Sequence, residues 1–486
     1  MIGICAYGGY VPRHRLNRMA IFGAMGWMNP VLIVHATGEK AVANFDEDSI
    51  TLATAAGINC MEGFERERLD GVYFASTTAP FRERQNSVIM AGALCAREDV
   101  RTADFAGSLR SGTSALLSAI EAVGFNGGGP VLVSAADCRL GKSASVQEMY
   151  FGDAGASVLV GSENVIAEFK GSCSLAEDFV DHVRGSNSRF DRQWEERWIR
   201  DLGYNKFIPE AVQRLCQKFE MTPQDFEKIV YPCYMPSARR QIVKMLEIDP
   251  AVEQDGLQTV VGDTGSAQPL LMLGMALEEA EPGDKLLVIG YGNGCDALYF
   301  EVTEEIKKLK HRKRVSRSLA ARQELDNYQK MLVWRDMIPA DIGARGEEDL
   351  MMRWSLEWRH HNAVLGLQGS KCEVCGEQQF PPQLICANSE CGAIDQRTPV
   401  NLSLGGGKIF TYTSDLLAAS VNPPSFYGSI EFDGGGRAMM DFTDCTQEEL
   451  VVGKRVKFTF RIQRYDSRRD LPIYFWKAIP IEEEVF

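Results

Sequence analysis

Four cysteines in the last third of the chain have the spacing of a metal site. Cys372 and Cys375 are separated by two residues, and Cys386 and Cys391 form a second pair separated by four. A glycine follows each pair, where such loops turn tightly. Four thiolates fill a tetrahedral ion and leave no position for water, so we expect a structural zinc. Iron is the alternative metal, and four free or disulfide-bonded cysteines are the alternative without one.

Composition narrows the class of protein before any element is assigned. The chain has 486 residues, a length that favours two or three domains. Its formal net charge of −14 argues against general nucleic-acid binding. Its apolar runs are too short for a membrane span, and the N-terminus lacks a signal-peptide layout. The 13 cysteines are an odd number and mostly scattered, which is typical of reduced thiols in a cytoplasmic protein.

The first 303 residues alternate between strand and helix patterns. This order predicts an α/β core with helices covering sheets. The apolar helix expected at 113–123 is too hydrophobic to face water, so we expect it to be buried. We expect strands at 2–6, 71–76, 130–134, 156–160, 228–231, 285–290 and 297–302, and helices at 46–57, 209–219 and 237–246.

The composition of the sequence then changes at about residue 304 and again at about residue 366. We interpret 304–365 as a helical linker, which contains a basic block at 305–323. On an acidic protein this block is either a solvated linker or a site for phosphate groups or an acidic partner. Residues 366–400 contain the four cysteines and read as a zinc ribbon. Residues 401–486 contain five short strand patterns with glycine turns, which predict a small barrel of the oligonucleotide/oligosaccharide-binding (OB) type.

Several segments of residues 1–303 together resemble a known family. The chain is similar to 3-hydroxy-3-methylglutaryl-CoA synthases, particularly the archaeal type, which implies a thiolase-like α/β fold. About 350–486 resembles the acyl-CoA-associated OB-fold proteins with a rubredoxin-like zinc ribbon. The segments of the first resemblance are GEKAVANFDEDSITLATAA (38–56), FAGSLRSGTSAL (105–116), EMYFGDAGASVLVG (148–161), GDTGSAQPLLML (262–273) and GYGNGCDAL (290–298).

The chain departs from that family where the family does its chemistry. The resemblance implies a catalytic cysteine, histidine and glutamate, which in this sequence fall on Leu109, Pro232 and near Thr77. None of these three side chains can do the work of the residue it replaces, and leucine cannot form a thioester. We therefore expect no catalytic residues of the family's kind.

Displaced groups are the alternative. Ser108 adjoins the expected nucleophile position, and Cys233 adjoins the expected histidine position. The serine would need a general base, and a buried free cysteine is usually inert. His182, beside Asp181, lies in a region where the family shapes its acyl pocket, although a structural histidine is the simpler interpretation.

The resemblance implies a function and partners. The favoured interpretation is that this chain is a non-catalytic subunit with a synthase-like part and a zinc/OB part. It would belong to a thiolase complex, and the complex would transfer acyl groups between acyl-CoA and CoA. Its partners would be a catalytic thiolase subunit and a second copy, in a self-dimer or a heterotetramer, with coenzyme A or acyl-CoA as ligand. The alternatives are a condensing enzyme with a relocated nucleophile and an acyl-CoA-binding scaffold. We expect neither a nucleic-acid nor a membrane partner.

Overall fold

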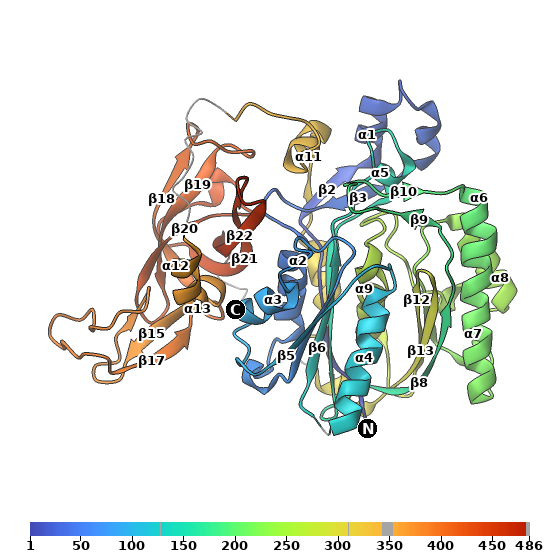
Figure 1. Cartoon of the computed structure of the whole chain (residues 1–486), viewed down its shortest axis with the longest axis horizontal. Coiled ribbons are helices and arrows are strands. Elements are labelled where there is room, and N and C mark those ends of the chain that lie inside the picture. The colour runs from blue at the N-terminus through green and yellow to red at the C-terminus, as the bar shows by residue number, and fades with distance from the viewer. Residues whose placement is uncertain (127, 310, 343–352, 483–486) are drawn as a thin grey trace. The chain divides into compact units, whose positions relative to one another are not determined.

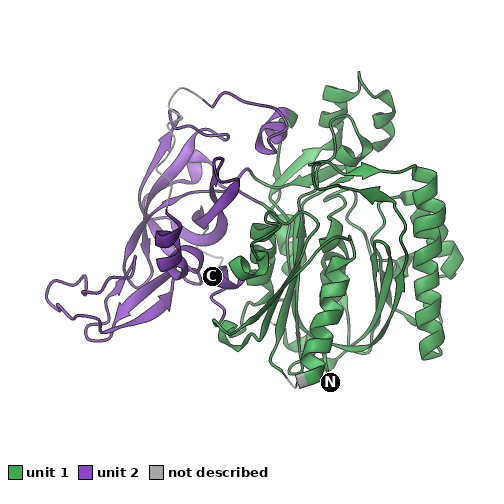
Figure 2. Cartoon of the chain, in the orientation of Figure 1, with its two compact units in different colours: residues 1–44, 48–90, 97–328 green, residues 45–47, 91–96, 329–486 purple. Residues whose placement is uncertain are grey.

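The computed structural model describes residues 1–126, 128–309, 311–342 and 353–482, and it divides into two compact units. Unit 1 contains residues 1–44, 48–90 and 97–328, and unit 2 contains 45–47, 91–96 and 329–486 (Figure 2). Two short segments early in the chain therefore belong with the C-terminal part. In the described residues, no helix is both long and apolar enough to cross a membrane.

Unit 1 is built on a nine-stranded mixed sheet (Figure 1). Each half of the sheet joins a parallel pair to antiparallel neighbours. In the first half, β4 runs parallel to β5 and β6, and β6 continues antiparallel through β7 to β1. In the second half, β11 is parallel to β12, which continues antiparallel through β13 to β8. The order is β11 (Lys228–Val230), β12 (Lys285–Tyr291), β13 (Gly294–Val302), β8 (Ala167–Ala176), β1 (Gly3–Tyr10), β7 (Ala154–Gly161), β6 (Val131–Asp137), β4 (Gly71–Ala75) and β5 (Arg101–Phe105).

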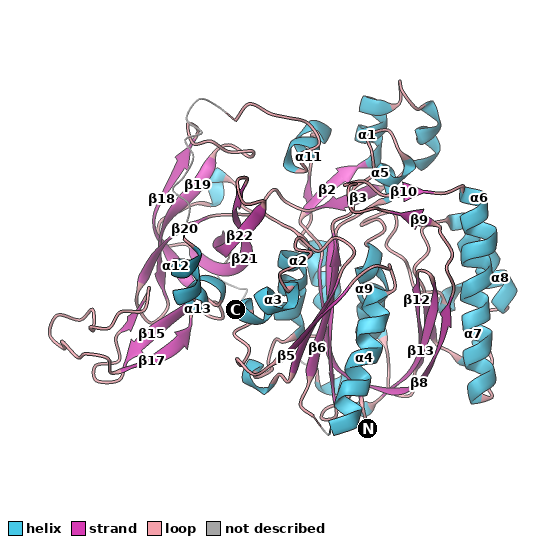
Figure 3. Ribbon diagram, viewed as in Figure 1, coloured by secondary structure: helices cyan, strands magenta, loops and turns pink. Residues whose placement is uncertain are grey.

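Helices form layers inside and outside the two halves (Figure 3). The helices α4 (Ser111–Asn126) and α9 (Gln268–Glu279) each contact strands of both halves and therefore lie between them. The helix α2 (Ser49–Cys60) covers the outer face of the first half, and α7 (Asn205–Phe219), joined by α8 (Pro236–Leu246), covers that of the second. This layering buries the apolar face of α4, as its composition predicted.

The predicted elements of unit 1 are present, with shifted ends. The helix expected at 46–57 begins at Ser49, because Asp48 accepts a hydrogen bond from the Thr51 amide and forms a capping box. The ten-residue strand β8 was not predicted, since its sequence AEFKGSCSLA has no regular alternation and little apolar content.

The predicted linker at 304–365 differs from the structure in its first third. Residues 304–328 belong to unit 1, and Arg314 is buried there with its guanidinium donating to the carbonyls of Asn59 and Cys60. Other cations of the basic block pair with nearby acids, as Arg317 does with Glu62 at 3.3 Å. Lys310 lies outside the described residues, as do 343–352 of the linker. The block therefore belongs to unit 1, although the side chains of Lys307, Lys308, Lys313, Arg317 and Arg322 remain exposed.

Unit 2 carries two small sheets. One contains β16 (Gln378–Gln379), β15 (Gln368–Cys372) and β17 (Arg397–Asn401). The other is antiparallel, and an isolated bridge from Phe442 to Ala478 connects the end of β20 to β22. Its order is β20 (Arg437–Asp441), β19 (Ser425–Phe432), β18 (Gly407–Asp415), β21 (Arg455–Asp466) and β22 (Leu471–Pro480).

A buried group of ion pairs ties segment 45–47 into unit 2. The Lys477 ammonium lies 3.1 Å from the Asp46 carboxylate, and Arg461 pairs with Glu47 and with Asp444. Burial raises the pKa of Asp46, but Lys477 and Arg461 outweigh that effect and hold the pKa below its usual value. All five side chains are nearly inaccessible to water, so each charge depends on its partners.

Candidate functional site

A small cavity lies in unit 1 at the position of the expected nucleophile. It has a volume of about 30 Å³, which is room for about two water-sized groups. We call it the Leu109 cavity. Its charged or titrating residues are Arg139, Asp181, His182, Asp191 and Asp263. Its remaining residues are Leu109, Gln147, Phe151, Gln193, Ile199, Tyr204 and Tyr234.

Leu109 lines this cavity just before the first turn of α4. The turn is fixed by Asp296 of β13, whose carboxylate accepts hydrogen bonds from the Thr113 hydroxyl at 2.9 Å and the Ser114 hydroxyl at 3.3 Å. Arg110 pairs with the same carboxylate at 3.4 Å. The backbone thus presents residue 109 to the cavity, but the side chain it presents is an aliphatic group without a nucleophile.

Thr77, at the expected glutamate position, has a structural role. Its amide and its hydroxyl donate to the Asp137 carboxylate at 2.7 and 3.0 Å. Ser76 and Thr78 donate to the same oxygen, and the Ser266 amide donates to the other one. Because Asp137 is fully buried, these donors satisfy a charge that would otherwise be costly, and they hold the loop after β4 in place.

The expected histidine position and its neighbour carry no base. Pro232 is half-buried directly after the Tyr231 that follows β11, and it has no proton to exchange. Burial raises the pKa of the Cys233 thiol to about 12, so at neutral pH it is a neutral thiol that donates weakly to the Met235 carbonyl.

Ser108, the second displaced candidate, is engaged with the backbone. Its hydroxyl donates to the Gly292 carbonyl at 2.9 Å and accepts from the Arg110 amide at 3.4 Å. Within the described residues, neither of these hydrogen bonds involves a histidine or a carboxylate. The geometry shows a loop-stabilising serine rather than an activated nucleophile.

Three arginine–aspartate contacts neutralise one wall of the cavity. The Arg139 guanidinium lies 2.7 Å from Asp263 and 3.9 Å from Asp191, and it stacks over the Phe151 ring at 4.0 Å. Arg184 pairs with Asp191 at 2.5 Å. Two cations therefore balance two carboxylates, which leaves Asp181, His182 and the phenols of Tyr204 and Tyr234 as the remaining titrating groups.

Asp181 and His182 form a hydrogen-bonded pair in the cavity wall. The Nδ1 atom of His182 lies 2.7 Å from the Asp181 carboxylate. Burial lowers the pKa of His182, but the hydrogen bond and charge of Asp181 outweigh it, so the pKa is raised above its usual value. The sequence singled out His182 by its neighbour Asp181, but only the fold places the pair in the same cavity as Leu109.

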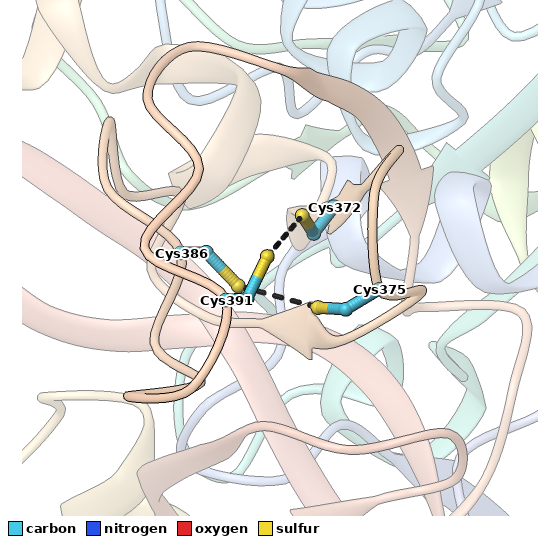
Figure 4. Close-up of side chains that lie close together, drawn as sticks. All are labelled: Cys372, Cys375, Cys386 and Cys391. Carbon is cyan, nitrogen blue, oxygen red and sulfur yellow. Dashed lines mark hydrogen bonds between the residues drawn. The ribbon is translucent and has the colours of Figure 1, made fainter.

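The four predicted metal ligands are brought together in unit 2 (Figure 4). The sulfurs of Cys372 and Cys391 are 3.9 Å apart and those of Cys375 and Cys386 are 3.5 Å apart, and all four lie within 4.8 Å of one another. Four thiolates at about 2.3 Å from a tetrahedral ion would be about 3.8 Å apart. The cluster thus has the donor set and spacing for a metal ion.

The left-handed glycines after each pair produce the two turns of this cluster. Gly376 has φ of +79° and Gly392 has φ of +60°, conformations that other residues adopt only with strain. The spacing of the cysteines had indicated both turns.

Comparison with known proteins supports the fold of unit 1. No protein-family model matches the chain. The solved structure of a hydroxymethylglutaryl-CoA synthase complexed with CoA aligns with a TM-score of 0.60 at 18% identity, over 72% of this chain and 94% of that one. A 3-oxoacyl-[acyl-carrier-protein] synthase III from Aquifex aeolicus aligns with a TM-score of 0.54 at 19% identity, over 62% and 100%. The fold is therefore the thiolase-like α/β fold.

Curated relatives make the assignment more specific. The hydroxymethylglutaryl-CoA synthase of Methanopyrus kandleri is 30% identical over 321 residues, which are 64% of this chain and 90% of the relative. That of Methanocaldococcus jannaschii is 28% identical over 344 residues, which are 68% and 96%. The chain belongs to the hydroxymethylglutaryl-CoA synthase family.

Proposed function

We propose that this chain is a subunit of a hetero-oligomeric thiolase complex and does not itself carry the acyl group. In this proposal a separate, cysteine-bearing thiolase takes the acyl group from acyl-CoA, and this chain supports its transfer to or from CoA. The observation that carries the proposal is that Leu109 presents an aliphatic side chain to the cavity. The sequence resemblance aligns this residue with the family's acylated cysteine.

The other two positions support the same conclusion. The Thr77 hydroxyl is committed to Asp137, and Pro232 has no titrating group. The Cys233 thiol, with its pKa raised to about 12, would be a poor nucleophile at neutral pH. The neighbouring side chains of Ser108 and Cys233 do not replace the missing groups in this proposal, because both are engaged in contacts with backbone carbonyls.

Coenzyme A or an acyl-CoA is the ligand that we propose for the complex. A solved relative of the same fold is a synthase complexed with CoA, and the curated relatives are synthases whose names include a CoA thioester. The Leu109 cavity is small, at about 30 Å³, which favours a short acyl group as its occupant.

For unit 2 we propose a zinc ribbon followed by an OB barrel. The sulfur spacing supports zinc, which would be held by Cys372, Cys375, Cys386 and Cys391 and would have no open position for catalysis. The strand order β20-β19-β18-β21-β22, with a bridge from the end of β20 to β22, supports a closed five-stranded barrel. The reduced state of such thiols favours a cytoplasmic location.

Intact-protein mass spectrometry tests the proposal. The purified chain is incubated with acetyl-CoA, propionyl-CoA and acetoacetyl-CoA, alone and together with whatever thiolase co-purifies from its native host. We expect no acyl adduct on this chain and an adduct on the thiolase. A stoichiometric adduct on this chain would contradict the proposal, and peptide mapping would then show which residue replaced the missing cysteine. A complex that contains no thiolase would contradict the proposed partner.

A further inference from the structure

Loss of the nucleophile has left the cavity with an intact set of proton-transfer groups. Asp181 binds the Nδ1 atom of His182 at 2.7 Å, so Nε2 is the ring nitrogen available to a ligand. His182 lines the cavity and its side chain retains 25% of its accessibility. An imidazole oriented by a carboxylate at one nitrogen is the arrangement of a general base at the other.

A second group in the same wall is an oriented hydrogen-bond donor. The Gln147 amide donates to the Gln193 carbonyl oxygen at 2.6 Å, and the Gln193 amide donates to the Tyr234 hydroxyl. Because the Tyr234 oxygen accepts from Gln193, its own proton is left for another acceptor. Burial raises the pKa of Tyr234 well above its usual value, so the hydroxyl stays protonated and remains a donor.

We propose that His182, oriented by Asp181, exchanges a proton with the α-carbon of a short acyl thioester whose carbonyl oxygen accepts a hydrogen bond from Tyr234. This activity needs no covalent adduct and goes beyond the proposed subunit function. Only the choice of a thioester as substrate rests on that function. Neither residue lies at a position that the family resemblance identified as catalytic.

The step balances without a further reactant. The α-C–H bond breaks and its proton goes to Nε2 of His182, while the electron pair moves onto the carbonyl oxygen to give an enolate. The imidazolium that forms is stabilised by Asp181, and the enolate oxygen by the Tyr234 hydroxyl. The reverse step returns a proton, or a deuteron in heavy water, to the carbon. Arg139 does not draw the enolate away from Tyr234, because its charge is paired with Asp263 and Asp191.

The size and charge of the cavity select the substrate. The cavity is small, at about 30 Å³, so the short thioester acetyl-CoA is the probe of choice. With two arginine charges balanced by Asp191 and Asp263, the wall has no excess cation to hold a free carboxylate. A neutral thioester therefore fits better than an anionic carboxylic acid.

Deuterium incorporation into the methyl group of acetyl-CoA tests the inference. The full-length chain is incubated with acetyl-CoA in deuterated buffer, and the thioester is analysed by mass spectrometry. We expect incorporation well above the rate in buffer alone, and a loss of at least about 100-fold in the His182→Gln variant. The matched control is His311→Gln, because His311 is exposed and lies outside the cavity.

Two further variants distinguish a catalytic role of His182 and Tyr234 from a purely structural one. Tyr234→Phe keeps the ring and removes only the donor, so we expect exchange to fall by about 10-fold or more with unchanged thermal unfolding. His182→Ala opens a space for free imidazole, and added imidazole should restore exchange, which a purely structural histidine would not show. If His182→Gln fails to fold, Tyr234→Phe decides the question.

The outcomes distinguish this inference from the proposed function. Exchange that stays at the buffer rate, or that is equal in wild type, His182→Gln and His311→Gln, overturns the proton-transfer site. An acyl adduct on this chain contradicts the proposed subunit function instead, and the exchange measurement still stands. Deuterium exchange without any acyl adduct supports both the proton-transfer site and the proposed subunit function.

Discussion

At the scale of single residues, Leu109 is the most informative side chain in the molecule. It stands at the start of α4 and lines the cavity, where a cysteine would gain thiolate character from the helix N-terminus. We predict that Leu109→Cys forms an acyl adduct with acetyl-CoA that wild type does not form. Intact mass spectrometry measures it, with Leu109→Met as the control of similar size. If the cysteine variant remains unmodified, the cavity does not admit a thioester and the proposed ligand is wrong.

The His182–Asp181 pair makes a prediction about stability and pH. The folded-state pKa of His182 is raised above its ordinary value of about 6.5, because the bond to Asp181 outweighs burial and the charge of Arg139. Stability from this pair is therefore fully present below that ordinary value and is lost as the pH rises through the folded-state value. We predict that His182→Gln lowers the free energy of unfolding more at pH 6 than at pH 9. Denaturant unfolding at both values measures this, and an equal loss at both would contradict the paired imidazolium.

At the scale of elements, the two cysteine loops between β15 and β17 depend on their metal. These loops have few buried apolar side chains, so a bound ion would supply much of their stability. We predict one zinc per chain by elemental analysis, and its loss in Cys375→Ser. Cys445→Ser, which changes a cysteine outside the cluster, should keep the metal. Retention of full zinc by Cys375→Ser, or the finding of iron, would contradict the zinc assignment.

The buried pair Asp46–Lys477 predicts a strong effect of one substitution. Removing the ammonium leaves the Asp46 carboxylate 1% exposed with its main partner missing. We predict that Lys477→Met lowers the free energy of unfolding of unit 2 by about 3–5 kcal/mol. Glu431→Gln, which breaks an exposed pair with Arg437 in the same unit, should cost less than about 1 kcal/mol. Equal effects would show that Lys477 is hydrated in solution.

At the scale of the whole molecule, the chain passes between the two units several times. Residues 45–47 and 91–96 belong to unit 2 although both lie within the synthase-like part of the sequence. A fragment of residues 329–486 therefore lacks Asp46 and Glu47, which neutralise Lys477 and Arg461. We predict that this fragment unfolds at a markedly lower temperature than unit 2 does in the full chain. Hydrogen exchange on β21 and β22 measures the difference, and equal protection would show that unit 2 folds without those segments.

The metal cluster and the fold class could be predicted from the sequence alone, because the patterns that specify them lie close together in the chain. The four cysteines and their glycine turns are close together in the chain, so their spacing was enough to predict the cluster. The alternation of strands and helices indicated the α/β fold. The motif around Leu109 predicts that the family's nucleophile is absent, and this stays a prediction. The OB topology remains a prediction of the same kind.

Only the tertiary structure decided what depends on residues far apart in the chain. It brought Leu109, Arg139, His182 and Tyr234 to one cavity, because the segments after β6, before α4 and after β11 converge there with the short strand β9 (His182–Val183). It also places Asp46 in unit 2, where the Asp46 carboxylate compensates the charge of Lys477 near the C-terminus. A linear pattern contains no information about such pairs, since burial and Coulomb attraction depend on distance in space and not on separation along the chain.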